Sequence, residues 1–285
     1  MRLISYTRLG QAGFGALTEG GVIALAGRLD RTVATLKQAI AGDLLREIRS
    51  FAKDRPAELA LSDVTLLPVI PDPAKILCIG LNYETHRHET GRAVAQYPSV
   101  FTRFADTQIA HGEAIVKPDV SNALDYEGEL AVVIGRGGRN IAEKDAMAHV
   151  AGYACYNDAT VRDWQRHTHQ FTPGKNFPST GAFGPALVSA DEVADYTRLP
   201  IATRVNGETV QSATLADLIF PIPRLIAYCS AFTPLSPGDV ILTGTPGGVG
   251  DRREPPSYLK AGDVIEVEIG GIGRLVNRIE NEARI

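Results

Sequence analysis

The sequence predicts a strand-rich α+β protein built on a mostly antiparallel or mixed sheet that curls on itself, with helices at its periphery. Two observations carry this prediction. Beyond residue 70, short apolar runs bounded by turn residues outnumber helical stretches, and Asn206-Gly207 and Gly270-Gly271 mark tight hairpins. We expect a small N-terminal α/β domain over residues 1–70 and a larger domain with the functional residues over 71–285.

The N-terminal unit combines short strands with a divided helix. Strand candidates lie beside Gly-rich turns at Ile4–Tyr6 and Val22–Leu25. Apolar residues then recur at helical spacing from residue 30 to about 53, and Gly42 followed by Asp43 divides this helix into two. The Pro-spaced segment 67–73 is suited to a rigid linker into the second unit.

The second unit consists mainly of strands. The expected strands are residues 76–81, 129–134, 152–156 and 240–243, together with the hairpin strands around 204–210 and 264–269. The expected helices are residues 142–150, 161–169 and 221–232.

Composition excludes several classes of protein. With 285 residues, 44% of them hydrophobic, the chain can bury a sizeable core. A net charge of -4 and the lack of a basic run argue against a nucleic-acid partner. No run approaches the roughly 20 apolar residues of a membrane helix, and the start lacks a secretory segment, so we expect a cytoplasmic protein without membrane association. Cys78, Cys155 and Cys229 lie far apart in apolar runs, as core residues of a reducing compartment do.

Two glutamates open the apolar run 127–135. Strand side chains alternate in direction, so Glu127 and Glu129 point the same way. They either lie on a solvated edge or bind a cation, since burial of two carboxylates requires compensation. Asp158 directly follows the apolar run 152–157 and is the best third ligand, presented at a sheet edge. Alternatively, it caps a helix that begins near Thr160. Three carboxylates favour Mg²⁺ or Mn²⁺ over Zn²⁺.

A polar stretch after the strand 76–81 contains a possible general base. In a helical turn, His86 and Glu89 are three residues apart and touch, and a carboxylate that orients a histidine makes a base for use near neutral pH. An exposed loop with an incidental ion pair is the alternative. Three further histidines are possible zinc ligands, namely His88, His167 and His169.

Two loops add polar groups. Lys175 lies in the Pro/Gly-rich stretch 171–181, which we expect to be irregular, where it either stabilises an oxyanion or is simply solvated. The Gly-rich loop, residues 243–250, exposes backbone N–H groups that suit a substrate carboxylate, although a plain loop fits equally well. It lacks the Lys-Ser/Thr ending of a phosphate-binding loop.

Taken together and in order, these stretches resemble the fumarylacetoacetate hydrolase family over about residues 70 to 280. The stretches that carry the resemblance are Ile79–Tyr83 with His86 and Glu89, His111–Gly112, Asp125–Leu130, Tyr156–Asp158 with Arg162, Asp163 and Gln165, Gly174–Phe177, Gly238–Asp239 and Thr243–Gly250. Each stretch is weak alone, but five or more in one order are specific. Two departures concern substrate choice: Leu81 stands where some acylpyruvate-cleaving relatives have arginine, and 177–185 differs from the loop of many relatives.

The resemblance implies a mixed β-roll with an N-terminal extension, as in an acylpyruvate hydrolase-like member, and commonly a homodimer. It implies Mg²⁺ or Mn²⁺ bound by Glu127, Glu129 and Asp158. It also implies that His86 and Glu89 activate water on a mobile lid. The remaining implied roles are catalysis by Lys175 and substrate contacts by Gln165, Thr245 and Arg162.

The expected function is metal-dependent hydrolysis of a carbon–carbon bond in an acylpyruvate-type 1,3-dioxo acid, such as fumarylpyruvate or maleylpyruvate, releasing pyruvate in aromatic-compound catabolism. Oxaloacetate decarboxylation, or dehydration or hydration of a sugar-derived 2-oxo acid, is the alternative within the family, because all these reactions chelate a 2-oxo acid. A non-catalytic module that binds small dicarboxylates through the Gly-rich loop is the alternative outside it.

Overall fold

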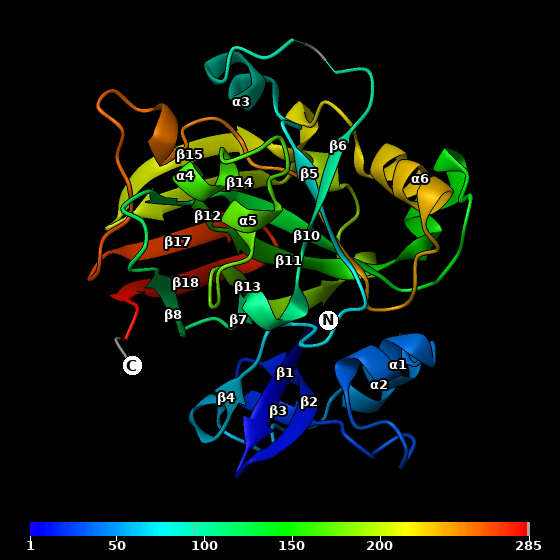
Figure 1. Ribbon diagram of the computed structural model, residues 1–285. Coiled ribbons are helices and arrows are strands. Elements are labelled where there is room, and N and C mark those ends of the chain that lie inside the picture. Colours follow the sequence, from blue (N-terminus) through cyan, green and yellow to red (C-terminus); the bar gives the residue numbers. More distant parts are fainter. Residues whose placement is uncertain (94, 284–285) are drawn as a thin grey trace.

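Two packed sheets form the body of the molecule in the computed structural model, which describes residues 1–93 and 95–283 (Figure 1). The larger sheet has the order β3-β2-β1-β13-β11-β10-β16-β5-β6, with β4 paired to β1 and β7 to β13. Its strands are β1 (Arg2–Arg8), β2 (Gln11–Thr18), β3 (Gly21–Ala24), β4 (Thr65–Leu66), β5 (Ile76–Gly80), β6 (Ser99–Arg103), β7 (Gln108–Ile109), β10 (Gly128–Ile134), β11 (Val150–Asp158), β13 (Gly181–Ser189) and β16 (Val240–Leu242).

The smaller sheet has the order β15-β14-β17-β18-β8 and packs against β10, β11 and β13. Its strands are β8 (Ala114–Lys117), β14 (Pro200–Val205), β15 (Glu208–Thr214), β17 (Val264–Ile269) and β18 (Gly273–Asn281). A two-stranded ribbon pairs β9 (Leu124–Asp125) with β12 (Thr160–Val161). Most pairs are antiparallel, but β16 runs parallel to β5 and β18 parallel to β8, as a mixed sheet requires. The predicted strand-rich α+β class is confirmed.

The helices are short and peripheral. The α-helices are α1 (Leu36–Ala41), α2 (Leu45–Ala52), α3 (Glu84–Glu89), α4 (Arg162–Gln165), α5 (Thr172–Lys175) and α6 (Ile222–Phe232). The 3-10 helices are η1 (Leu61–Asp63), η2 (Ala105–Thr107), η3 (Glu143–His149), η4 (Ala190–Glu192), η5 (Tyr196–Arg198), η6 (Leu215–Asp217) and η7 (Gly250–Arg252).

Strand β10 is apolar at successive positions because both of its faces are buried. Leu130, Val132 and Ile134 belong to the core between the two sheets. Ala131 and Val133 point the other way, into a second core that includes buried residues of α1 and α2. A strand buried on both faces carries apolar residues at every position. Its polar end, at Glu129, therefore lies deep inside the protein.

The first 70 residues contribute β1–β4 to the larger sheet, with Leu3 of β1 opposite Leu187 of β13. The predicted division of the helix at Gly42 and Asp43 is confirmed, because α1 ends at Ala41 and α2 begins at Leu45. The domain boundary at residue 70 stays a prediction. No helix in the described residues combines the length and apolar character that crossing a membrane requires.

The helix expected over 142–150 is confirmed as the 3-10 helix η3, Glu143–His149. Two other local expectations are wrong. The helix expected over 161–169 is only the single turn α4. Conversely, the stretch expected to be irregular contains α5, with Pro173 in its first turn. The N–H groups in the first turn of a helix have no partner within the helix. A proline at this position, which lacks an N–H, therefore loses no hydrogen bond and favours the turn.

Candidate active site

Three carboxylates meet where β10 and β11 lie side by side. Glu127 directly precedes β10, Glu129 is its second residue, and Asp158 ends β11; one oxygen of each lies within 4.8 Å of the others. Their exposures are 5%, 1% and 0%, which excludes a solvated edge. Asp158 is not at a sheet edge as expected, because β11 lies between β10 and β13. It caps no helix either, since α4 begins only at Arg162.

Cations surround two of these carboxylates and leave the third without one. Lys175 Nζ lies 2.7 Å from Glu127 Oε2 and 2.5 Å from Asp158 Oδ2. Arg162 Nη1 lies 2.7 Å from Glu127 Oε1. Glu129 accepts a hydrogen bond from the Gly244 N–H at 2.7 Å and has no ion pair among the described residues. Three converging buried carboxylates, one of them uncompensated, fit a hard divalent cation.

The pKa shifts follow from this arrangement. Burial alone would raise the pKa of the Glu127 carboxyl, but the charges of Lys175 and Arg162 outweigh burial and lower it to about 2. Burial raises the pKa of Glu129 well above its usual range, and the neighbouring Asp158 and Glu127 raise it further. Burial would lower the pKa of Lys175, yet Asp158 and Glu127 raise it. These shifts favour the charged form of Lys175 and the protonated form of Glu129.

His86 and Glu89 touch, as predicted from their spacing. Both lie on α3, where His86 Nδ1 is 2.6 Å from Glu89 Oε1. The second oxygen of Glu89 accepts the Gly248 N–H at 2.8 Å. Thr85 Oγ1 of the same helix accepts the Gly247 N–H at 3.0 Å. Two backbone amides thus hold α3 against the Gly-rich loop, and Nε2 is the ring nitrogen of His86 left for chemistry.

The Gly-rich loop binds carboxylates of the chain itself. Its amides donate to Glu129 from Gly244, to Glu89 from Gly248 and to Asp125 from Gly250. These three amides are therefore not free for a substrate carboxylate, and a substrate contact elsewhere in the loop stays a prediction. The residue pattern indicated carboxylate binding correctly, but not which carboxylates are bound.

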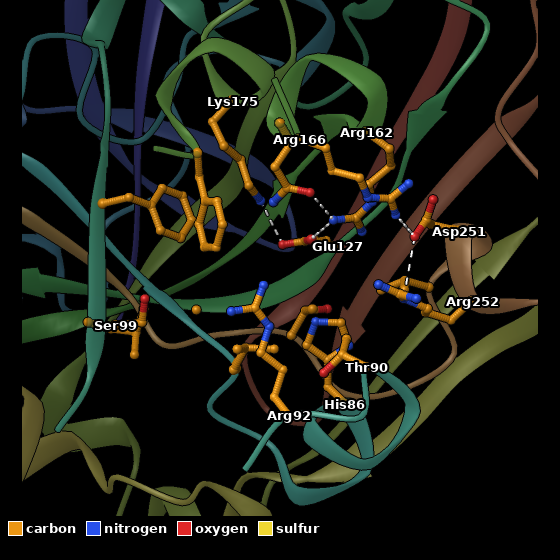
Figure 2. A pocket seen from close by; sticks show the side chains of 18 of the residues that line it. His86, Thr90, Arg92, Ser99, Glu127, Arg162, Arg166, Lys175, Asp251 and Arg252 are labelled. Carbon is orange, nitrogen blue, oxygen red and sulfur yellow. Dashed lines mark hydrogen bonds and ion pairs between the residues drawn. The ribbon is translucent and has the colours of Figure 1, made fainter. Parts of the chain in front are cut away.

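A cavity of about 420 Å³ is lined by His86 of the pair and by Glu127 of the triad, together with Lys175 and Arg162. Figure 2 shows Lys175 and Arg162 approaching Glu127 from one side and His86 lying on the other side in this view. Phe101 of β6 and Phe171 form an apolar wall, with ring centroids 5.6 Å apart. The volume suits a small molecule.

The remaining predicted contact residues all line this cavity. Gln165 accepts a hydrogen bond from Arg162 Nη1 at 3.0 Å. Thr245 donates to the Gly128 carbonyl at 3.0 Å and accepts from Gln211. Arg162 Nη2 is buried and has no hydrogen-bond partner in residues 1–93 and 95–283. Their contacts with substrate stay predictions.

The histidines considered as zinc ligands lie apart from the triad. His88 is exposed and 3.1 Å from Glu84, and His167 packs against the Trp164 ring. His169 lines the cavity. Among the described residues, the side chains that converge as possible metal ligands are the three carboxylates Glu127, Glu129 and Asp158, and no histidine joins them.

Two supporting residues were missed by sequence reasoning. Arg103, 2% exposed at the end of β6, donates to Asp158 at 2.6 Å and fixes that carboxylate from behind. Asp125, fully buried, accepts from Arg162 Nε at 2.8 Å and from two amides of the loop that follows Val249. Asp125 is the first residue of the stretch Asp125–Leu130, so its position in that stretch could have identified it. Arg103 could have been identified as an arginine at the end of a half-buried strand.

A strand-rich fold that encloses a cavity with buried carboxylates and a histidine–glutamate pair defines an enzyme that acts on a small molecule. Residues 75–280 match the family described as Fumarylacetoacetate (FAA) hydrolase C-terminal. The chain belongs to this family and is an enzyme of its superfamily.

Two curated relatives and one solved structure show which named enzymes this chain is similar to. Human mitochondrial oxaloacetate tautomerase FAHD2A is 44% identical over 233 residues, covering 81% of this chain and 74% of its own. Oxaloacetate tautomerase YisK of Bacillus subtilis is 45% identical over 244 residues, covering 82% and 81%. The structure of maleylpyruvate hydrolase from Sphingobium sp. SYK-6, in complex with manganese (II) ion and pyruvate, has a TM-score of 0.83 at 27% identity and covers 99% and 100%.

The expected hydrolysis of an acylpyruvate is therefore wrong, and with it the expected place in aromatic catabolism. The relatives at 44% and 45% identity are named oxaloacetate tautomerases, whereas the hydrolase is 27% identical. Oxaloacetate, the substrate of one expected alternative, agrees better with these names. The residues that carry the family resemblance do not distinguish these reactions.

Proposed function

We propose that this protein interconverts the keto and enol forms of oxaloacetate or a closely related 2-oxo dicarboxylate, with Mg²⁺ or Mn²⁺ bound by Glu127, Glu129 and Asp158. The observation that carries the proposal is that His86, paired with Glu89, lines the same cavity as Glu127 of the buried carboxylate triad. The names of the relatives supply the substrate.

The reaction needs a proton transfer and no water. In the direction from keto to enol, the C3–H bond breaks, His86 Nε2 takes the proton, and the resulting imidazolium returns it to the oxygen on C2, which regenerates the neutral base. No atom is gained or lost. Glu89, at 2.6 Å from Nδ1, keeps the ring proton on Nδ1 and stabilises the imidazolium that forms.

Negative charge develops on the substrate oxygen as the C3 proton leaves. When bound, a divalent cation supplies Lewis acidity for the 2-oxo acid end. Lys175 keeps its charge because Asp158 and Glu127 raise its pKa, so it contributes a fixed positive charge beside the reacting end. The unpartnered Arg162 Nη2 gives a free donor, with Gln165 beside it and Thr245 on the same cavity wall.

The test is a spectrophotometric assay of enol-oxaloacetate with protein loaded with Mg²⁺ or Mn²⁺. We expect the enol absorbance to decay faster than with the metal alone, while total oxaloacetate, measured with malate dehydrogenase, stays constant. Decay at the metal-only rate would refute the proposal. Loss of oxaloacetate with release of pyruvate would replace it with decarboxylation.

A homodimer and a cytoplasmic location remain part of the proposal. The family resemblance supports the first. The human relative is mitochondrial by name, so location differs between members.

A further inference from the structure

One cation on the cavity wall differs from the others. Four of them pair with carboxylates: Lys175, Arg162, Arg166 and Arg252. The fifth, Arg92, has no hydrogen bond or ion pair from its side chain to any residue in 1–93 or 95–283. Arg92 is exposed, and its backbone carbonyl accepts a hydrogen bond from Arg87 Nη1 at 2.6 Å. Among the described residues, the Arg92 guanidinium is therefore a positive charge on the cavity wall that is not paired with a carboxylate.

Arg92 lies on the same segment as the proposed base. It follows α3 by three residues, after the helix cap at Thr90 and the turn at Gly91. Figure 2 shows its side chain extending toward the middle of the cavity, on the side of Glu127 where His86 lies in this view. A ligand bound by Arg92 thus contacts the segment that carries His86 and Glu89.

The residues at the inner end of the cavity can bind only the 2-oxo acid end of a dicarboxylate ligand. There Glu127 of the carboxylate triad and Arg162, whose buried Nη2 has no hydrogen-bond partner among the described residues, suit the 2-oxo acid end. A second carboxylate cannot face the apolar wall of Phe101 and Phe171 without a desolvation cost. Arg92 offers it a guanidinium that is free of competing carboxylates.

We propose that Arg92 binds the second carboxylate of the substrate, and that this contact makes the enzyme select 2-oxo dicarboxylates over 2-oxo monocarboxylates. The inference rests on the proposed function for the identity of the substrate.

The experiment measures binding without turnover. Calorimetry on Mn²⁺-loaded protein gives affinities for malate and for lactate, which lacks the second carboxylate. We expect the wild type to prefer malate by about 10- to 100-fold, the range for a charge-assisted hydrogen bond. Arg92→Gln should reduce this preference to below about threefold, and Arg92→Lys should retain part of it. Lactate affinity should stay unchanged in both, which also reports an intact site.

Arg166→Gln is the matched control, because it removes a cavity arginine that already pairs with Asp251; it should keep the preference for malate. An unchanged preference in Arg92→Gln, or an equal loss for both ligands, would overturn the inference. If the preference depends on Arg92 while the wild type fails to tautomerise oxaloacetate, the proposed function is wrong and the inference about Arg92 stands.

Discussion

Replacing Glu89 with glutamine tests how this carboxylate sets the protonation of His86. Glu89 contacts His86 Nδ1 at 2.6 Å and accepts the Gly248 N–H at 2.8 Å. A backbone N–H only donates, so the oxygen of a glutamine amide would face Gly248 and its NH₂ would face the ring. Nδ1 would then accept, which moves the imidazole proton to Nε2. The nitrogen that has to take the substrate proton would already carry one.

The expected cost is the loss of general base catalysis. Such a role is worth about 10²- to 10⁴-fold in rate, or about 3–5 kcal/mol in the activation barrier at 1.36 kcal/mol per tenfold change. We therefore expect kcat for Glu89→Gln to fall in that range. Metal affinity should stay unchanged, because Glu89 lies outside the triad.

The assay is enol decay under saturating metal, with metal binding measured separately by calorimetry. Glu84→Gln is the matched control: Glu84 lies on the same helix, is half exposed and pairs with Arg87, so its loss should leave kcat unchanged. A kcat for Glu89→Gln within about threefold of the wild type would refute the tautomer argument.

Three further predictions concern the support of the site. Glu129→Gln removes the one triad member without a cationic partner, so affinity for Mn²⁺ should fall by at least tenfold in calorimetry while the fold persists; unchanged affinity would exclude Glu129 as a ligand. Because burial and the neighbouring carboxylates raise the pKa of Glu129, a cation has to displace its proton. Affinity for Mn²⁺ should rise with pH up to that raised pKa, with release of about one proton measured in buffers of different protonation enthalpy; the absence of proton release would contradict the assignment. Arg103→Leu breaks a fully buried ion pair with Asp158 and should lower the free energy of unfolding by about 3 kcal/mol in a urea titration, whereas a change below about 0.5 kcal/mol would show that Lys175 compensates alone.

Local spacing made the central parts of the site predictable. The period of a strand brings Glu127 and Glu129 to one side, and the period of a helix brings His86 to Glu89. Their contacts depend on neighbours in the chain, so the sequence contains them directly. The α+β class followed similarly from apolar runs and turn residues.

The missed features depend on residues far apart in the chain. Arg103 reaches Asp158 across 55 positions, and the Gly248 amide reaches Glu89 across 159. A pattern of residues identifies an amide-rich loop but not the carboxylate that it binds. The unpaired state of Arg92 depends on every other charge in the cavity, so it is evident only from the fold.

The reaction itself was the part that the residues distinguished least, because hydrolysis, decarboxylation and tautomerisation all begin at the same 2-oxo acid. What separates tautomerisation is a single positioned base that adds a proton to one face of C3. The most direct measurement is ketonisation of enol-oxaloacetate in D₂O, with the product trapped at once by malate dehydrogenase and its C3 configuration determined by NMR. We predict malate with deuterium in one configuration at C3, and loss of this selectivity in Glu89→Gln. An equal mixture of the two configurations with the wild-type protein would contradict the account.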